Sequence, residues 1–277
     1  FRKCLNYDFR TNPIRISHSH TNNWFPFFEH KFKMELKNRT VLVTGAGVRL
    51  GQAIAVSLGK QRMRVALHYH QSLEGAKETL ELIGGDSKQH GCFQADLRQV
   101  SEIELLTQQI EAQIGQIDVL INNAADFFPT PLGEVVESEW DHLISLNLKA
   151  PFFLSQLVGT SMLKRGQGKI VNIVDVAAER PWPQFLPYCA SKAGLVSLTR
   201  GLATALAPAV QVNAVAPGTM LPPPESSSFS QDLAIERSLL KKMGRPDDIA
   251  KAVIYFLEND FVTGTVLPVD GGRILAS

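Results

Sequence analysis

Residues 40–51 read TVLVTGAGVRLG, an apolar strand pattern that runs into a glycine-rich turn and then into a helical pattern. Gly45 permits a tight turn, and the amide groups that open a helix attract a phosphate through their N–H groups and the helix dipole. A glycine turn alone is weak evidence, because glycines also end strands for structural reasons. Between a strand and a helix, the turn predicts a nucleotide-binding site.

The strand-then-helix pattern repeats along the rest of the chain. Strands are expected at 40–44, 64–69, 91–94, 118–122, 169–174 and 211–216, with helices at 50–60, 73–83, 101–114, around 139–164 and up to Ala207. Such alternation predicts a parallel sheet covered by helices, and no second core is evident. Residues 217–230 read PGTMLPPPESSSFS, which is typical of a mobile loop over a site rather than of a domain boundary.

Residues 1–33 differ in composition from the rest of the chain. They hold six Lys/Arg and two Asp/Glu, so residues 34–277 carry 22 basic and 25 acidic side chains and suit no polyanionic partner. Because Met34 directly precedes the first regular pattern, we interpret residues 1–33 as a non-domain extension and residues 34–277 as one domain, with a targeting leader as the alternative. Three scattered cysteines and no apolar run of about 20 residues favour a reducing, cytoplasmic setting without membrane or nucleic-acid partners.

A second stretch suggests catalysis. Tyr188 and Lys192 are four residues apart, so on a helix they share a face, and the ammonium is expected to lower the pKa of the phenol. The apolar run 170–174 predicts a buried strand that delivers Asp175 to the same place. An acid, a phenol and an amine would then meet at one site.

The strand at 64–69 leads into His70, Gln71 and Ser72 without an acidic residue. A site for NAD usually has Asp or Glu here, which would repel the 2'-phosphate of NADP. His70, Gln71 and Ser72 can donate hydrogen bonds to that phosphate and Arg49 can supply charge, so NADPH is the expected cofactor. Two histidines, His68 and His70, without a third ligand predict no metal site.

These motifs resemble the short-chain dehydrogenase/reductase family over residues 40–277. The family features are the glycine turn, polar residues after several strands, the Tyr/Lys pair and closing glycines, found here at 45–51, 96–97, 122–125, Asn147, Tyr188, Lys192, 217–218 and 269–272. The chain is most similar to pteridine reductases, in residues 49–51, HYHQS at 68–72, NNAADFFPTPL at 122–132, and Asp175 where most relatives have serine.

The resemblance implies a single-domain α/β fold of the Rossmann type, a doubly wound parallel sheet of about seven strands flanked by helices. It implies a homotetramer built through long helices. The implied cofactor-binding residues, with Asp96 at the adenine, are Gly45, Arg49, Leu50, Gly51, His70, Gln71, Ser72, Asp96, Leu97, Asn122, Ala124, Lys192, Pro217 and Gly218.

The resemblance also implies catalytic roles. Lys192 would hold the nicotinamide ribose, Tyr188 would donate a proton, and Asn147 would support a water relay to Lys192. Asp175 could exchange a proton with a ring nitrogen, which serine cannot. Substrate contacts would come from Phe127, Arg49, Asp175 and Tyr188, the Phe127 ring lying over a pterin that has the nicotinamide on its other face.

The expected function is NADPH-dependent reduction of a small dihydropterin or related C=N compound. One alternative is a carbonyl reductase of the same family, acting on an acyl thioester, a sugar or a xenobiotic ketone. A non-catalytic module that senses NADP(H) is another, although the intact Tyr188 and Lys192 argue against it. Gln71 stands where the resemblance suggests arginine, so the preference for NADPH is expected to be weaker than in relatives.

Overall fold

The computed structural model describes residues 34–85, 89–220, 232 and 235–276. The interpretation of residues 1–33 as an extension therefore lies outside the described residues. Most of the loop expected at 217–230 lies outside them as well. No helix within these ranges is long and apolar enough to cross a membrane.

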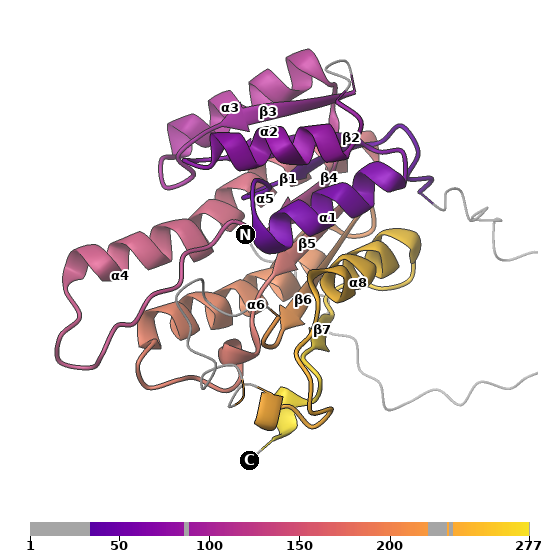
Figure 1. Cartoon of the computed structure of the whole chain (residues 1–277). Helices are drawn as coiled ribbons and strands as arrows, with labels where there is room; N and C mark the ends of the chain where they lie inside the picture. The colour runs from indigo at the N-terminus through magenta and orange to yellow at the C-terminus, as the bar shows by residue number, and fades with distance from the viewer. Residues whose placement is uncertain (1–33, 86–88, 221–231, 233–234, 277) are drawn as a thin grey trace, which may run out of the picture. The chain divides into compact units, whose positions relative to one another are not determined.

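Seven parallel strands form one sheet in the order β3-β2-β1-β4-β5-β6-β7 (Figure 1). Their bounds are β1 Thr40–Val43, β2 Arg64–Tyr69, β3 His90–Gln94, β4 Ile117–Asn122, β5 Gly168–Ile173, β6 Val210–Pro217 and β7 Val266–Val269. The strand order reverses between β1 and β4, as in a doubly wound sheet. The expected α/β fold with about seven strands is confirmed.

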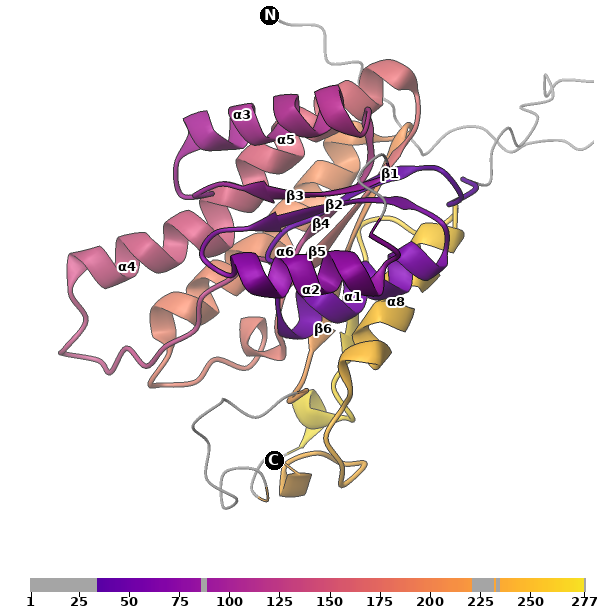
Figure 2. The ribbon, with the colours of Figure 1, turned by 45° about the horizontal axis from the view of Figure 1, so that its top comes forward.

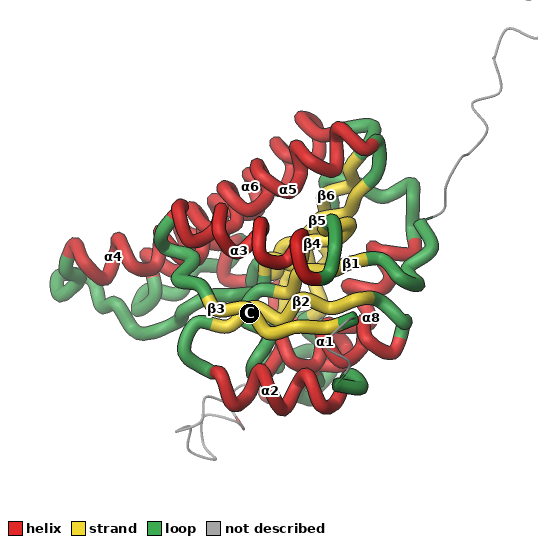
Figure 3. The backbone as a smooth tube through the Cα atoms, turned by 90° about the horizontal axis from the view of Figure 1, so that it is seen from above, coloured by secondary structure: helices red, strands yellow, loops and turns green. Residues whose placement is uncertain are grey.

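Helices cover both faces of the sheet (Figures 2 and 3). One face carries α1 Arg49–Lys60, α2 Leu73–Leu82 and α8 Pro246–Glu258, and the other carries α3 Val100–Gln113, α5 Ala150–Arg165 and α6 Leu186–Leu206. Successive side chains of a strand point to opposite faces of the sheet and so reach both helix layers. Val41 and Val43 pack with α1 and α8, whereas Leu42 packs with α3 and α5. Burial on both sides explains why the strands read as continuous apolar runs.

The helical stretch expected around 139–164 is interrupted. Helix α4 spans Glu137–Ile144, a π-helical segment η1 spans Ser145–Lys149, and α5 follows from Ala150. Two short turns complete the described elements, η2 at Val176–Ala178 and η3 at Arg273–Leu275.

Candidate active site

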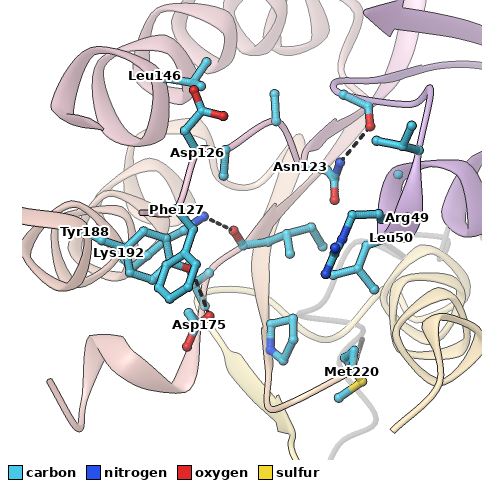
Figure 4. A pocket seen from close by; sticks show the side chains of 18 of the residues that line it. Arg49, Leu50, Asn123, Asp126, Phe127, Leu146, Asp175, Tyr188, Lys192 and Met220 are labelled. Atoms are coloured by element: carbon cyan, nitrogen blue, oxygen red, sulfur yellow. Dashed lines mark hydrogen bonds between the residues drawn. The ribbon is translucent and has the colours of Figure 1, made fainter. Parts of the chain in front are cut away.

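A cavity of about 760 Å³ lies at the C-terminal edge of the sheet, within the usual volume of a ligand site. Residues that follow β1, β2, β3, β4 and β5 line it, together with the end of β6. The cavity therefore sits where the strand order reverses, the position at which open α/β sheets bind ligands. In Figure 4, Arg49 and Leu50 stand on one side of the cavity, and Phe127, Tyr188 and Lys192 stand on the other.

The glycine turn between β1 and α1 is closed too tightly for any side chain. Gly45 has φ +64°, and a Cβ at Gly51 would fall 2.0 Å from the carbonyl oxygen of Gly45. Only glycine allows the start of α1 to approach the turn so closely. Arg49 opens the helix with φ +53°, a conformation that costs an L-residue energy and that places this cation in the cavity lining.

His68 ties this turn to the neighbouring strands, a role that its sequence context does not reveal. Its Nδ1 accepts a hydrogen bond from the Gly45 N–H at 3.1 Å, and its Nε2 lies 3.1 Å from the carbonyl oxygen of Ala95. An acceptor Nδ1 requires the neutral ring with its proton on Nε2. Burial lowers the pKa of His68 to about 4, so the ring stays neutral at physiological pH.

Thr44 and Asn123 join β1 to β4 beneath the cavity. The Thr44 Oγ1 accepts from the N–H groups of Asn123 and Ala124, each at 2.9 Å. The Asn123 side chain donates to the carbonyl oxygens of Thr44 at 2.8 Å and Gly45 at 3.2 Å. These bonds hold the ends of the two central strands at a fixed separation.

Asp175, Tyr188 and Lys192 meet at the opposite side of the cavity. The Tyr188 hydroxyl donates to Asp175 Oδ2 at 2.8 Å, and Asp175 Oδ1 accepts from the Ala177 N–H at 2.8 Å. Lys192 donates to the carbonyl oxygen of Ile173 at 2.9 Å, and its Nζ lies 5.7 Å from the Tyr188 ring centroid. Tyr188 and Lys192 thus share one face of α6, as their spacing predicts.

Burial dominates the protonation of this group. It raises the pKa of the Asp175 carboxyl and lowers the pKa of Lys192 to about 8. The pKa of Tyr188 is raised well above its usual range by burial and then by the Asp175 charge. The expectation of a lowered Tyr188 pKa is therefore wrong for this structure, because burial and the adjacent Asp175 carboxyl raise that pKa.

An aromatic cluster packs against the Tyr188 ring. Phe127 stacks on Phe185 with centroids 4.4 Å apart and an interplanar angle of 9°, and it meets the edge-on rings of Tyr188 at 4.8 Å and Trp182 at 6.1 Å. Phe127 still exposes 47% of its surface. Trp182 and Phe185 come from the loop before α6, which a β-bridge between Thr130 and Phe185 ties to the Phe127 loop.

A polar chain crosses the cavity rim. Arg98 binds both carboxylate oxygens of Asp96, at 2.8 and 2.7 Å, and its Nη1 lies 3.0 Å from His142 Nδ1. The other ring nitrogen of His142 lies 2.5 Å from Asp126 Oδ2. The Arg98 side chain holds the pKa of Asp96 well below its usual range. Asp96 lines the cavity with its carboxylate already paired, so its contact with adenine stays a prediction.

Two expected site residues do not line the cavity. Asn122 points away from it and donates to Ser155 Oγ at 3.1 Å and Asn172 Oδ1 at 2.8 Å. Asn123, the next residue, lines the cavity instead and corrects that prediction. Asn147 is fully buried, and its side chain exchanges two 3.0 Å hydrogen bonds with the backbone of Asp126.

The other expected residues all line the cavity, although their roles stay predictions. They are Gly45, Arg49, Leu50, Gly51, His70, Gln71, Ser72, Asp96, Leu97, Ala124, Phe127, Asp175, Tyr188, Lys192, Pro217 and Gly218. The sequence interpretation assigned no site role to Trp182 or Arg273, which line it too. They approach the cavity only through the fold.

Comparison with known proteins agrees with this geometry. The family model for short chain dehydrogenase matches residues 39–232. The chain belongs to the short-chain dehydrogenase family. It is 34% identical to the 3-oxoacyl-[acyl-carrier-protein] reductase of Staphylococcus epidermidis, over 86% of this chain and 100% of that protein. It is also 34% identical to the 3beta-hydroxysteroid dehydrogenase 1 of Eggerthella lenta, over 87% and 95% of the two chains.

Among solved structures, this short-chain dehydrogenase resembles the FolM alternative dihydrofolate reductase 1 of Brucella canis complexed with NADP. The TM-score is 0.82 at 32% identity, covering 88% of this chain and 96% of the other. Short-chain dehydrogenases are oxidoreductases that bind a nicotinamide cofactor. The closed glycine turn at the cavity edge fits that cofactor, because a Cβ at Gly51 would obstruct the turn.

Proposed function

We propose that the chain is an NADPH-dependent reductase of a dihydropterin or a related C=N compound. The observation that carries the proposal is the 2.8 Å hydrogen bond from Tyr188 to Asp175 beside the Phe127 ring. A carboxyl with a raised pKa keeps its proton at higher pH and can pass it to a ring nitrogen. The aromatic rings around it suit a flat heterocycle, for which offset stacking contributes about 0.5–1.5 kcal/mol beyond area burial.

The proton supply would come from the chain's own residues. Asp175 would protonate the ring nitrogen, and Tyr188, already donating to Asp175, would restore the proton. The Lys192 Nζ, close to the Tyr188 ring, would stabilise negative charge that develops on the phenol. Bound NADPH would supply the hydride.

Support for NADPH comes from the residues after β2. His70, Gln71 and Ser72 line the cavity with Arg49, and none of them is acidic. They offer hydrogen-bond donors and one guanidinium to a 2'-phosphate. Gln71 contributes a neutral hydrogen bond, so we expect kcat/KM to favour NADPH over NADH by a smaller margin than an arginine there would give.

Carbonyl reduction is the second candidate. The relatives named as a 3-oxoacyl reductase and a hydroxysteroid dehydrogenase favour it, and Tyr188 with Lys192 would suffice to protonate an alkoxide. The discriminating residue is Asp175. Carbonyl reduction needs one proton, which Tyr188 would supply, so Asp175 would then have no proton-transfer role.

The test is NADPH oxidation by the full chain with 7,8-dihydrobiopterin, 7,8-dihydrofolate, simple ketones and acetoacetyl-CoA. Pterin turnover that falls at least about 100-fold in Tyr188→Phe would support the proposal. Turnover of ketones or thioesters alone would discard the pterin assignment and leave the carbonyl reductase. NADPH binding without NADPH oxidation in the presence of any of these substrates would favour the non-catalytic module that senses NADP(H).

A further inference from the structure

The C-terminal turn places an arginine in the cavity wall on the side of Asp175. Arg273 begins η3 and lines the cavity together with Asp175. Asp270 fixes this turn, because its carboxylate accepts from the N–H groups of Gly272 at 2.9 Å and Ile274 at 2.7 Å. The backbone therefore sets the position of Arg273, and its side chain plays no part in holding the turn.

The Arg273 guanidinium has no hydrogen bond or ion pair with any residue that the structure describes. It is nonetheless partly buried. Unpaired cations are rarely buried, because an arginine that gives up water normally gains a carboxylate or several carbonyl groups. A partly buried guanidinium on a cavity wall is therefore available to hydrogen-bond a ligand.

Two further arginines, both exposed and outside the cavity lining, add positive charge close to Arg273. Arg180 donates to the carbonyl oxygens of Arg273 at 3.5 Å and Ile274 at 3.4 Å. Arg237 precedes Ser238, whose hydroxyl donates to the carbonyl oxygen of Gly271 at 3.0 Å. Three segments far apart in the sequence therefore bring like charges together.

The existing carboxylates do not neutralise this charge. Burial lowers the pKa of Arg273, the charges of Arg237 and Arg180 lower it further, and Asp175 and Asp270 oppose them. Asp270 has both oxygens engaged by backbone N–H groups, and burial favours the neutral form of Asp175. An incoming anion would offset the repulsion that Arg180 and Arg237 exert on the Arg273 charge.

We propose that Arg273, with Arg180 and Arg237 close by, binds an anionic tail, a carboxylate or a phosphate, of the substrate that reacts at Asp175 and Tyr188. The proposal rests on the proposed function and narrows its substrate class. A planar guanidinium binds either anion through two parallel hydrogen bonds. A pterin with a glutamate tail should then be preferred over one with a neutral side chain, and a phosphate-bearing thioester over a neutral ketoester.

The experiment compares substrates that share a reacting group and differ in tail charge. With the full chain and NADPH, kcat and KM are measured for dihydrofolate against dihydrobiopterin, and for acetoacetyl-CoA against ethyl acetoacetate. Arg273→Gln should raise the KM of the anionic member about 10-fold more than that of the neutral member. Arg273→Lys should restore part of the preference, and Arg200→Gln, which removes an exposed charge from α6 outside the cavity lining, should not alter it.

Equal losses on both members of a pair, or an unchanged preference, would overturn the proposal. If Arg273→Gln fails to fold, salt gives a second measurement: only the anionic substrate's KM should rise with NaCl in the unmodified chain. Turnover of acetoacetyl-CoA and ethyl acetoacetate alone would reject the pterin function. The effect of Arg273→Gln on the KM values of these two substrates would then decide the tail site. If no substrate is turned over, the binding of folate and of biopterin is measured by quenching of tryptophan fluorescence, since Trp182 lines the cavity. Equal affinities for the two pterins would overturn the proposed tail site.

Discussion

Burial raises the pKa of the Asp175 carboxyl, so we expect it to keep a transferable proton to higher pH than an ordinary carboxyl does. Because its pKa is raised, pterin reduction should decline as the pH rises through that raised pKa. Asp175→Ser should lower kcat for pterin about 100-fold or more and leave the Kd of NADPH within about twofold. Asp175→Asn should remove the high-pH decline, which steady-state rates from pH 5 to 9 would show. Parallel losses in rate and NADPH binding would contradict a proton-transfer role.

We expect the buried Lys192 ammonium to lower the free energy of unfolding, although catalysis requires it. Its pKa of about 8, against an ordinary 10.5, corresponds to about 3 kcal/mol of penalty for the buried charge. The unfolded chain binds the extra proton between these values, so wild-type stability should rise with pH across that window. Lys192→Met should stabilise the fold at pH 7 by about 1–2 kcal/mol after losing the bond to Ile173, while abolishing activity.

Denaturant unfolding at pH 7 and near pH 10.5 would test the Lys192 substitution. The gain of Lys192→Met over wild type should shrink toward zero, or reverse, at the higher pH. A less stable variant at pH 7 would show that the buried ammonium is compensated by the protein.

His68, in β2, connects the ends of β1 and β3, because its ring contacts Gly45 after β1 and Ala95 after β3. Its folded pKa of about 4 lies below the unfolded 6.5, so stability should fall as the pH drops from about 6.5 toward 4, by up to about 3 kcal/mol. His68→Asn keeps an acceptor for the Gly45 N–H and should flatten this slope. His68→Leu loses the acceptor and should weaken NADPH binding about 10-fold.

Urea unfolding at pH 7 and 5, with NADPH titrations at pH 7, would test the role of His68. His70→Asn is the control for the stability slope, because His70 follows the same strand and is exposed. An unchanged acid slope in His68→Asn would contradict the neutral, buried ring.

The helices and strands were predicted well because each depends on the pattern of apolar residues within its own short stretch of sequence. The expected helix 101–114 and the observed Val100–Gln113 differ by one residue at each end. The pattern could not tell Asn122 from Asn123, because successive residues at the end of a strand face opposite sides and no local signal marks which side holds the cavity. The contact of Arg98 with His142 joins residues that only the fold brings together.

For the whole molecule, the alternation of strands and helices sufficed to predict the sheet and hence a site at its C-terminal edge. The composition of that site was less predictable. Arg273 reaches the cavity because β7 pairs with β6 and returns the chain beside Asp175. No spacing in the sequence encodes this meeting, which depends on the order of the strands.

The family resemblance leads us to propose a homotetramer. Helix α5 is a candidate for its subunit interface. Leu154, Val158 and Met162 face the core, yet Leu157 and Leu163 on the same helix are 39% and 40% exposed. A helix that is apolar beyond its core face is typical of one covered twice. Leu157→Glu should therefore split the assembly and lower Tm, because a charge in an apolar interface is costly.

Light scattering would give the mass in multiples of the 30.5 kDa chain. Leu82→Glu is the matched control, since Leu82 is 58% exposed at the end of α2, on the opposite face of the sheet. Dissociation by Leu157→Glu alone would assign the interface to α5. A wild-type mass of one chain, or equal dissociation by both variants, would contradict it, because the exposed leucines of α5 would then have no partner that distinguishes them from Leu82.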